Sequence, residues 1–217
     1  MERWRGALTL LGDDAARVRW RYAAFELDPS IPSQGVDPRA SLEAKYGPGA
    51  AEVLGGRLAE VAEAEGLPMV ALAEIKVRPN TFGAHRLLTA ALEEGEAAQQ
   101  ALADALFAAY WARGEDVGDA EVLGAVSAAA GLSRDWAAAN LAADANVAEV
   151  RAEERRAAER GIRAVPTFVF GERSALSGAQ APEALADAVR QALASSQAPG
   201  SAGADGQDRR RRGTPGS

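Results

Sequence analysis

Few residues in this chain could carry out chemistry, and their types exclude several reactions at once. The sequence contains no cysteine and a single histidine, His85. Without cysteine the chain can form no disulfide, thiolate–metal bond or thiolate nucleophile. A metal site built on several histidines is excluded as well. Imidazole titrates near neutral pH, so His85 is a candidate acid or base, although a sole histidine on a half-apolar helix is more often structural.

The Val165-Pro166 peptide precedes a short apolar run. Gly161 can end a helix in the left-handed conformation, and proline disfavours helix at the residue before it. Residues Thr167 to Phe170 are β-branched or aromatic and too few for a helix, so they predict a buried strand. Ser174 to Gly178 predict a returning strand. Pro182 then begins an amphipathic helix.

Composition limits the class of protein. The 217 residues are 47% hydrophobic, which suits one large domain or a domain with an insertion. A net charge of −7 argues against a nucleic-acid-binding protein. No apolar run approaches the length of a membrane span, and no secretory leader opens the sequence. We therefore expect a soluble, cytoplasmic protein with no membrane partner.

The remaining elements follow from hydrophobic patterning. Residues Arg17 to Leu27 alternate apolar and polar, which predicts a strand with one buried face and one solvated, arginine-bearing face. From Asp37 to Arg160 the alanine-rich sequence predicts a series of helices separated by glycines. In the helix predicted for residues 50–65, Leu54, Leu58 and Val61 should point inward. Acidic pairs such as Glu153-Glu154 should lie on charged helix faces and pair with arginines.

Two stretches carry a family resemblance. Val165 to Phe168, followed by Ser177 to Gln180, resembles the DsbA-like thioredoxin family and, within it, the FrnE-like branch. Asn80 to Leu87 resembles the N-T-x-x-A-H-R-L pattern of that branch, and the likeness extends over about residues 4–193. It implies an α/β, thioredoxin-like fold with a large all-helical insertion. Residues 1–36 and 161–195 would form the thioredoxin-like part, 37–160 the insertion and 196–217 a disordered tail.

The resemblance also implies a binding surface. In that family the Val-Pro peptide is cis and its backbone lies against the redox cysteines. Val165 and Pro166 would therefore bind a peptide or thiol, which could pair with their backbone by strand addition. His85 would be a supporting residue. The implied partners are polypeptide thiols and disulfides or glutathione, with no other cofactor and no metal. The oligomeric state is not readable from these residues.

This sequence departs from the family at the site of the reaction. DsbA-like proteins carry Cys-x-x-Cys at the start of their first helix, and this chain has no such motif. We expect that Met1 lies inside that helix, that the first strand and the start of the helix are missing, and that the codons upstream encode an apolar strand followed by Cys-Pro-x-Cys. Three hypotheses remain open: an oxidoreductase whose chain starts at an internal methionine, a glutathione-dependent isomerase relative, and a non-catalytic, holdase-like peptide-binding module.

The purified chain is expected to be inert in thiol–disulfide exchange. Exchange requires a thiolate that attacks a disulfide sulfur, and the chain contains no thiol. Insulin reduction, measured against an enzyme-free blank on a preparation checked by mass spectrometry for contaminating thiol proteins, tests this. Turnover above the blank would contradict the prediction.

Overall fold

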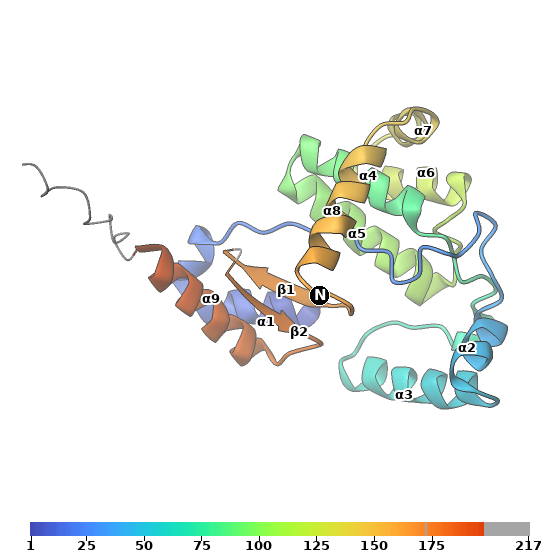
Figure 1. The fold of residues 1–217 in the computed structure, drawn as a ribbon, viewed down its shortest axis with the longest axis horizontal. Coiled ribbons are helices and arrows are strands. Elements are labelled where there is room, and N and C mark those ends of the chain that lie inside the picture. Colours follow the sequence, from blue (N-terminus) through green and yellow to red (C-terminus); the bar gives the residue numbers. More distant parts are fainter. Residues whose placement is uncertain (172, 198–217) are drawn as a thin grey trace, which may run out of the picture. The chain divides into compact units, whose positions relative to one another are not determined.

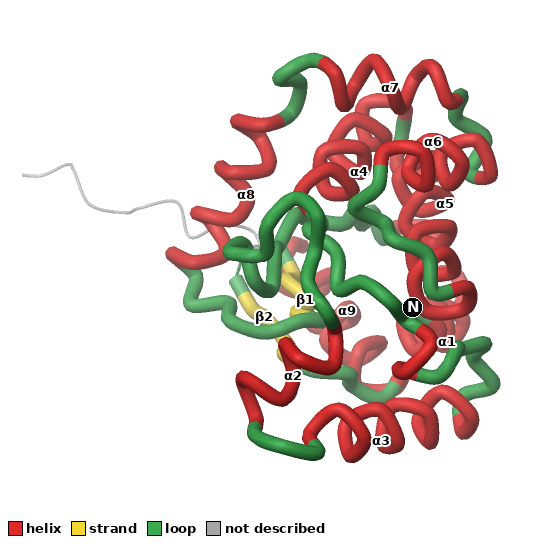
Figure 2. The backbone as a smooth tube through the Cα atoms, turned by 90° about the vertical axis from the view of Figure 1, so that its right-hand side faces the viewer, coloured by secondary structure: helices red, strands yellow, loops and turns green. Residues whose placement is uncertain are grey.

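The computed structural model describes residues 1–171 and 173–197. Most of these residues are helical, and two short strands form a sheet (Figures 1 and 2). The chain divides into two compact units: Met1–Val18 with the chain from Pro166 onward, and Arg19–Val165. The domains expected from the sequence had other boundaries, with residues 19–36 and 161–165 in the thioredoxin-like part, whereas here they belong to the unit of residues 19–165. Each unit is described separately below.

The first unit contains the termini of the described chain. Its elements are α1 (Glu2–Leu11), the 3₁₀ helix η1 (Gly12–Arg17), β1 (Thr167–Phe170), β2 (Ser174–Ser177) and α9 (Pro182–Gln197). The two strands pair antiparallel, with Phe168 opposite Leu176 and Val169 opposite Ala175. The hairpin and the final helix are confirmed, but the expected burial of β1 is wrong, since only Phe170 is buried and Val169 is exposed. Helix α9 continues to Gln197, so it includes the first two residues of the expected tail, and residues 198–217 lie outside the described chain.

Apolar contacts between helices and hairpin hold this unit together. The rings of Trp4 on α1 and Phe168 on β1 stack with centroids 5.8 Å apart. Leu185 and Val189 of α9 are buried, as their spacing on one helix face predicts. Helices α1 and α9 approach closely at Gly6, where an added Cβ would lie 3.2 Å from the Pro182 ring. This unit therefore has a small core of its own.

All the regular secondary-structure elements of the second unit are helices. Its elements are α2 (Pro38–Tyr46), α3 (Ala50–Ala64), the 3₁₀ helix η2 (Leu72–Glu74), α4 (Phe82–Glu94), α5 (Glu96–Phe107), the π-helical turn η3 (Ala108–Ala112), α6 (Ala120–Ala129), α7 (Arg134–Ala142) and α8 (Val147–Glu159). Side-chain caps fix several of the starts. Asp37, Asp119 and Ser133 each accept backbone N–H bonds from the first turn of the helix that follows. The predicted start of the helical series at Asp37 is confirmed.

The core of the second unit lies between α4, α5, α6 and α7. Leu87, Leu102, Leu123 and Val126 are almost fully buried there. The predicted inward face of α3 is wrong, since Leu58 is exposed and Val61 is 51% exposed, whereas Ala51 and Ala62 are buried. The main neighbours of helix α3 are the short elements α2 and η2.

The strand predicted for residues 17–27 is also wrong. Residues 18–26 have no regular secondary structure, although the predicted alternation persists: Trp20 and Tyr22 are half-buried and Arg19 and Arg21 are exposed. The backbone of Tyr22 pairs with the side chain of Gln99 on α5 instead of a strand. Its N–H donates to Gln99 Oε1 at 2.8 Å, and Gln99 Nε2 donates to its carbonyl at 3.1 Å. The Gln99 side chain thus makes the two hydrogen bonds that a neighbouring strand would make with the Tyr22 backbone.

Replacing Gln99 with Leu is expected to lower the free energy of unfolding by about 1–3 kcal/mol, because it leaves buried backbone groups of Tyr22 without partners. Urea denaturation followed by tryptophan fluorescence measures the loss. Gln100→Leu is the matched control, since the Gln100 side chain is half-buried and takes no part in this pairing. Equal effects of the two substitutions would contradict the prediction.

Candidate functional site

His85 lies on α4, in the unit of residues 19–165. The helix begins just before it, where Asn80 Oδ1 accepts the Phe82 N–H at 3.0 Å. Burial lowers the pKa of His85, and this outweighs the carboxylates of Glu154 and Glu153 and a hydrogen bond with the Phe25 backbone, all of which favour the charged ring. His85 is therefore neutral at pH 7. It contacts residues 19–27, which we call the extended segment.

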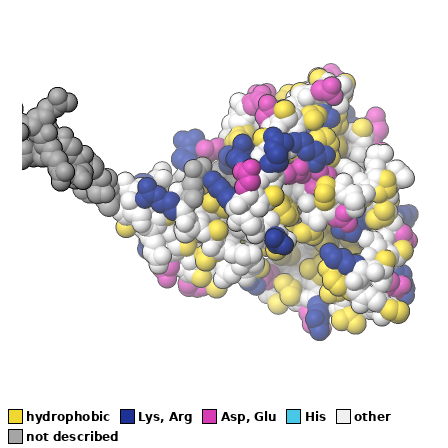
Figure 3. Space-filling view, in the orientation of Figure 1, with side chains coloured by type: hydrophobic (Ala, Val, Ile, Leu, Met, Phe, Trp, Pro, Cys, Tyr) yellow, Lys and Arg dark blue, Asp and Glu magenta, His cyan; other side chains and the backbone are white. Residues whose placement is uncertain are grey.

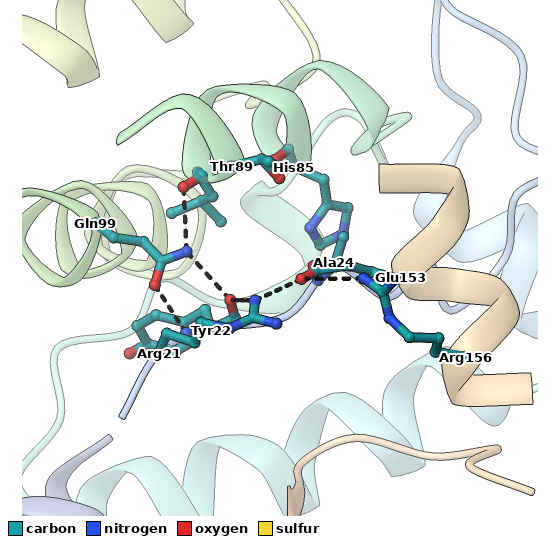
Figure 4. Close-up of polar contacts among 9 residues, drawn as sticks. Arg21, Tyr22, Ala24, His85, Thr89, Gln99, Glu153 and Arg156 are labelled. Carbon is teal, nitrogen blue, oxygen red and sulfur yellow. Dashed lines mark hydrogen bonds and ion pairs between the residues drawn. The ribbon is translucent and has the colours of Figure 1, made fainter. Parts of the chain in front are cut away.

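Glu153 on α8 reaches the same segment from another direction. Its side chain is only 9% exposed, and it accepts the Ala24 N–H at 2.6 Å and Arg21 Nη1 at 2.5 Å. Figure 4 shows Glu153 and Gln99 approaching the segment from different helices. The expected pairing of Glu153 with arginine is confirmed, but its place on a solvated face is wrong. A buried carboxylate is needed here because a backbone N–H requires an acceptor.

A third polar contact holds the end of the segment. Arg151 Nη1 on α8 lies 2.5 Å from Glu26 Oε2 and 2.7 Å from Glu154 Oε2. The guanidinium also stacks over the Phe82 ring, 4.0 Å from its centre. Burial raises the pKa of Glu26, although Arg151 opposes this. Lys and Arg side chains gather over α8 on the face shown in Figure 3, with acidic ones beside them.

Sequence reasoning missed Gln99 and Glu26 as site residues, although both carry a signal. Gln99 occupies the same helical stripe as Leu102 and Leu106, where a polar residue in a core position marks a specific partner. Glu26 has the same parity as Tyr22 and Ala24, so the alternating pattern places it on the inner face, and it is buried. In both cases a polar residue occupies a position that the hydrophobic pattern assigns to the interior, which indicates a buried polar contact.

The Val165-Pro166 peptide stands at the boundary between the two units, with Pro166 in the unit of the hairpin. The Pro166 carbonyl accepts the Gly178 N–H at 2.8 Å, which extends the pairing of β1 with β2 by one residue. The side chain of Val165 is exposed. His85 belongs to the unit of residues 19–165 and Pro166 to the unit of the hairpin. The cis geometry of the peptide stays a prediction.

The described residues contain neither a metal-binding cluster nor a membrane-spanning helix. Within residues 1–171 and 173–197, no group of three or more His, Cys, Asp or Glu side chains could hold a metal ion. None of the helices in the same residues has the length and apolar character needed to cross a membrane.

The sole histidine gives one imidazole signal in a proton NMR titration. Its midpoint is expected below the ordinary value of 6.5, because burial disfavours the charged ring. Glu153→Gln should lower the midpoint further by removing a nearby negative charge. Glu149→Gln, at an exposed position on the same helix, should leave it unchanged. A midpoint at or above 6.5 in the unmodified chain would overturn this account of His85.

Comparisons with known proteins agree with this architecture. The family described as "DSBA-like thioredoxin domain" matches residues 4–190. The chain is also similar to a crystal structure of a probable DsbA oxidoreductase from Streptomyces coelicolor. The two sequences are 34% identical, the match covers 88% of this chain and 82% of the other, and the TM-score is 0.76. No curated protein matches the chain. The family match spans most of the chain, so this protein belongs to the DsbA-like family of thioredoxin-fold proteins.

Proposed function

We propose that this chain is a DsbA-family protein of the thiol–disulfide oxidoreductase type that binds peptides and does not exchange disulfides by itself. One observation carries the proposal: the family matches residues 4–190, yet no residue of the chain can form a thiolate. DsbA-like proteins act on protein thiols. The cysteine-free chain would keep the means to hold such a substrate without the group that attacks it.

The proposed binding surface is the edge of β1 that faces away from β2. Because Gly178 bonds to Pro166, and antiparallel pairing alternates, the backbone groups of Phe168 face β2 and those of Val169 face the other edge. Among the described residues the sheet contains these two strands only. An extended peptide could therefore add to β1 through the backbone of Val169.

The residues around this edge suit an extended, partly apolar ligand. The Val169 side chain is 41% exposed, and Val165 is exposed just before the strand. Val165 and Pro166 would continue the surface, as the family resemblance implies. A cytoplasmic location fits the proposal, because a chain without disulfides has no need of an oxidising compartment. Glutathione, a short peptide thiol, is the alternative ligand for the same edge.

Fluorescence anisotropy with a labelled, cysteine-free extended peptide tests the surface. Val169→Pro removes an N–H from the outer edge of β1, and the loss of one hydrogen bond should weaken binding roughly two- to tenfold. Ala175→Pro is the matched control, because Ala175 lies opposite Val169 and its N–H faces the far edge of β2. Circular dichroism verifies that both variants fold.

Each outcome of this experiment decides between the hypotheses. Weaker binding in Val169→Pro alone supports the proposed edge. Absence of peptide binding by the unmodified chain refutes the peptide-binding function. Displacement of the peptide by glutathione would instead favour the glutathione-dependent relatives of the family.

A further inference from the structure

Two buried carboxyl groups share one arginine nitrogen in the helical unit. The side chains of Glu26 and Glu154 are 3% and 18% exposed, and Nη1 of Arg151 contacts one oxygen of each. The second oxygen of Glu154, Oε1, is buried, and no donor among the described residues bonds to it. Both carboxyl groups therefore meet at one nitrogen, and burial, together with the neighbouring Glu154, raises the pKa of Glu26. An ionised carboxylate only accepts, so neither group in its charged form can donate to the unpaired oxygen of Glu154.

When both are ionised, the two carboxylates have one direct arginine partner between them. From α8, Arg151 supplies its positive charge to Glu26 and Glu154. The adjacent Glu153 has arginines of its own: it is paired with Arg21, and its Oε1 lies 3.9 Å from Arg156 Nη2. From α4, Glu153, Glu154 and Arg151 all act on His85, whose pKa is lowered by burial. Two buried carboxylates would thus share a single arginine nitrogen, which is costly.

We propose that Glu26 and Glu154 share one proton, and that this proton holds the extended segment of residues 19–27 against α8. The Glu26 hydroxyl donates to Glu154 Oε1, while the Oε2 atoms of both residues accept from Arg151. A single proton thereby gives Glu154 Oε1 a hydrogen-bond donor and removes one of the two negative charges at Arg151. The raised pKa that burial gives Glu26 agrees with this assignment.

Loss of the proton should loosen the segment. The two carboxylates would then both be charged at one arginine nitrogen. Because Glu154 lies on α8 and Glu26 on the segment, their repulsion pushes the segment away from the helix. Because the pKa of Glu26 is higher in the folded than in the unfolded chain, the stabilisation is complete below the ordinary value of 4.5 and is lost as pH rises through the raised value. His85 acts in the opposite sense, since its lowered pKa costs stability as pH falls below 6.5. The proposal does not depend on peptide binding.

The test compares Glu26→Gln with the unmodified chain. The glutamine amide donates permanently to Glu154 Oε1, as the shared proton does, and its oxygen still accepts from Arg151. In urea denaturation between about pH 4.5 and about pH 8, the unfolding constant of the unmodified chain should rise by up to about tenfold per pH unit within the titration of the pair. Glu26→Gln should lack this rise. Glu149→Gln, an exposed change on α8, should follow the unmodified chain.

A second measurement follows the carboxyl carbons directly. In carbon-13 NMR the Glu26 carboxyl carbon should titrate above the range of the exposed glutamates, and Glu154→Gln should lower its midpoint, because Glu154 helps to raise the pKa of Glu26. Hydrogen-exchange protection of the Tyr22 and Ala24 amides should fall over the same pH range. Parallel stability curves for Glu26→Gln and the unmodified chain, or ordinary glutamate midpoints throughout, would overturn the proposal.

Discussion

The helical unit depends on side chains that bond to the backbone of the extended segment. Tyr22 pairs with Gln99 of α5, Ala24 donates to Glu153 of α8, and His85 of α4 contacts the backbone of Phe25. Buried backbone groups need partners, and no neighbouring strand supplies them among the described residues. Three helices therefore meet at one stretch of chain, and the segment fixes their spacing.

This arrangement places charge where globular proteins seldom bury it. Glu26 and Glu153 are almost inaccessible, and each is accompanied by an arginine on a neighbouring element. Buried ion pairs gain little net free energy, because desolvation offsets their attraction, but the loss of one partner is expensive. The main effect of these ion pairs is therefore to fix the position of the segment, and their net contribution to the stability of the fold is small. Because they include carboxylates, that position depends on protonation.

The unit with the hairpin shows that a fold and its chemistry can be separated. Its strands, the stacking of Trp4 on Phe168 and the buried face of α9 need no cysteine. Disulfide exchange, in contrast, requires a thiolate whatever the fold. Membership of the DsbA-like family thus accounts for the architecture, whereas the residues present decide what the chain can do.

The sequence by itself determined the features that depend on near neighbours. The capping of α7 by Ser133 and the strand at residues 167–170 were predictable, because a cap or a strand after proline acts within a few residues. The lack of thiol chemistry followed from composition alone. Only the tertiary structure decided that Tyr22 pairs with a side chain instead of a strand and that Glu153 is buried. Their partners lie far along the chain, 77 residues away for Tyr22 and Gln99 and 129 for Ala24 and Glu153. Alternation establishes which side of a segment faces inward, but burial and hydrogen bonding depend on what packs against that side.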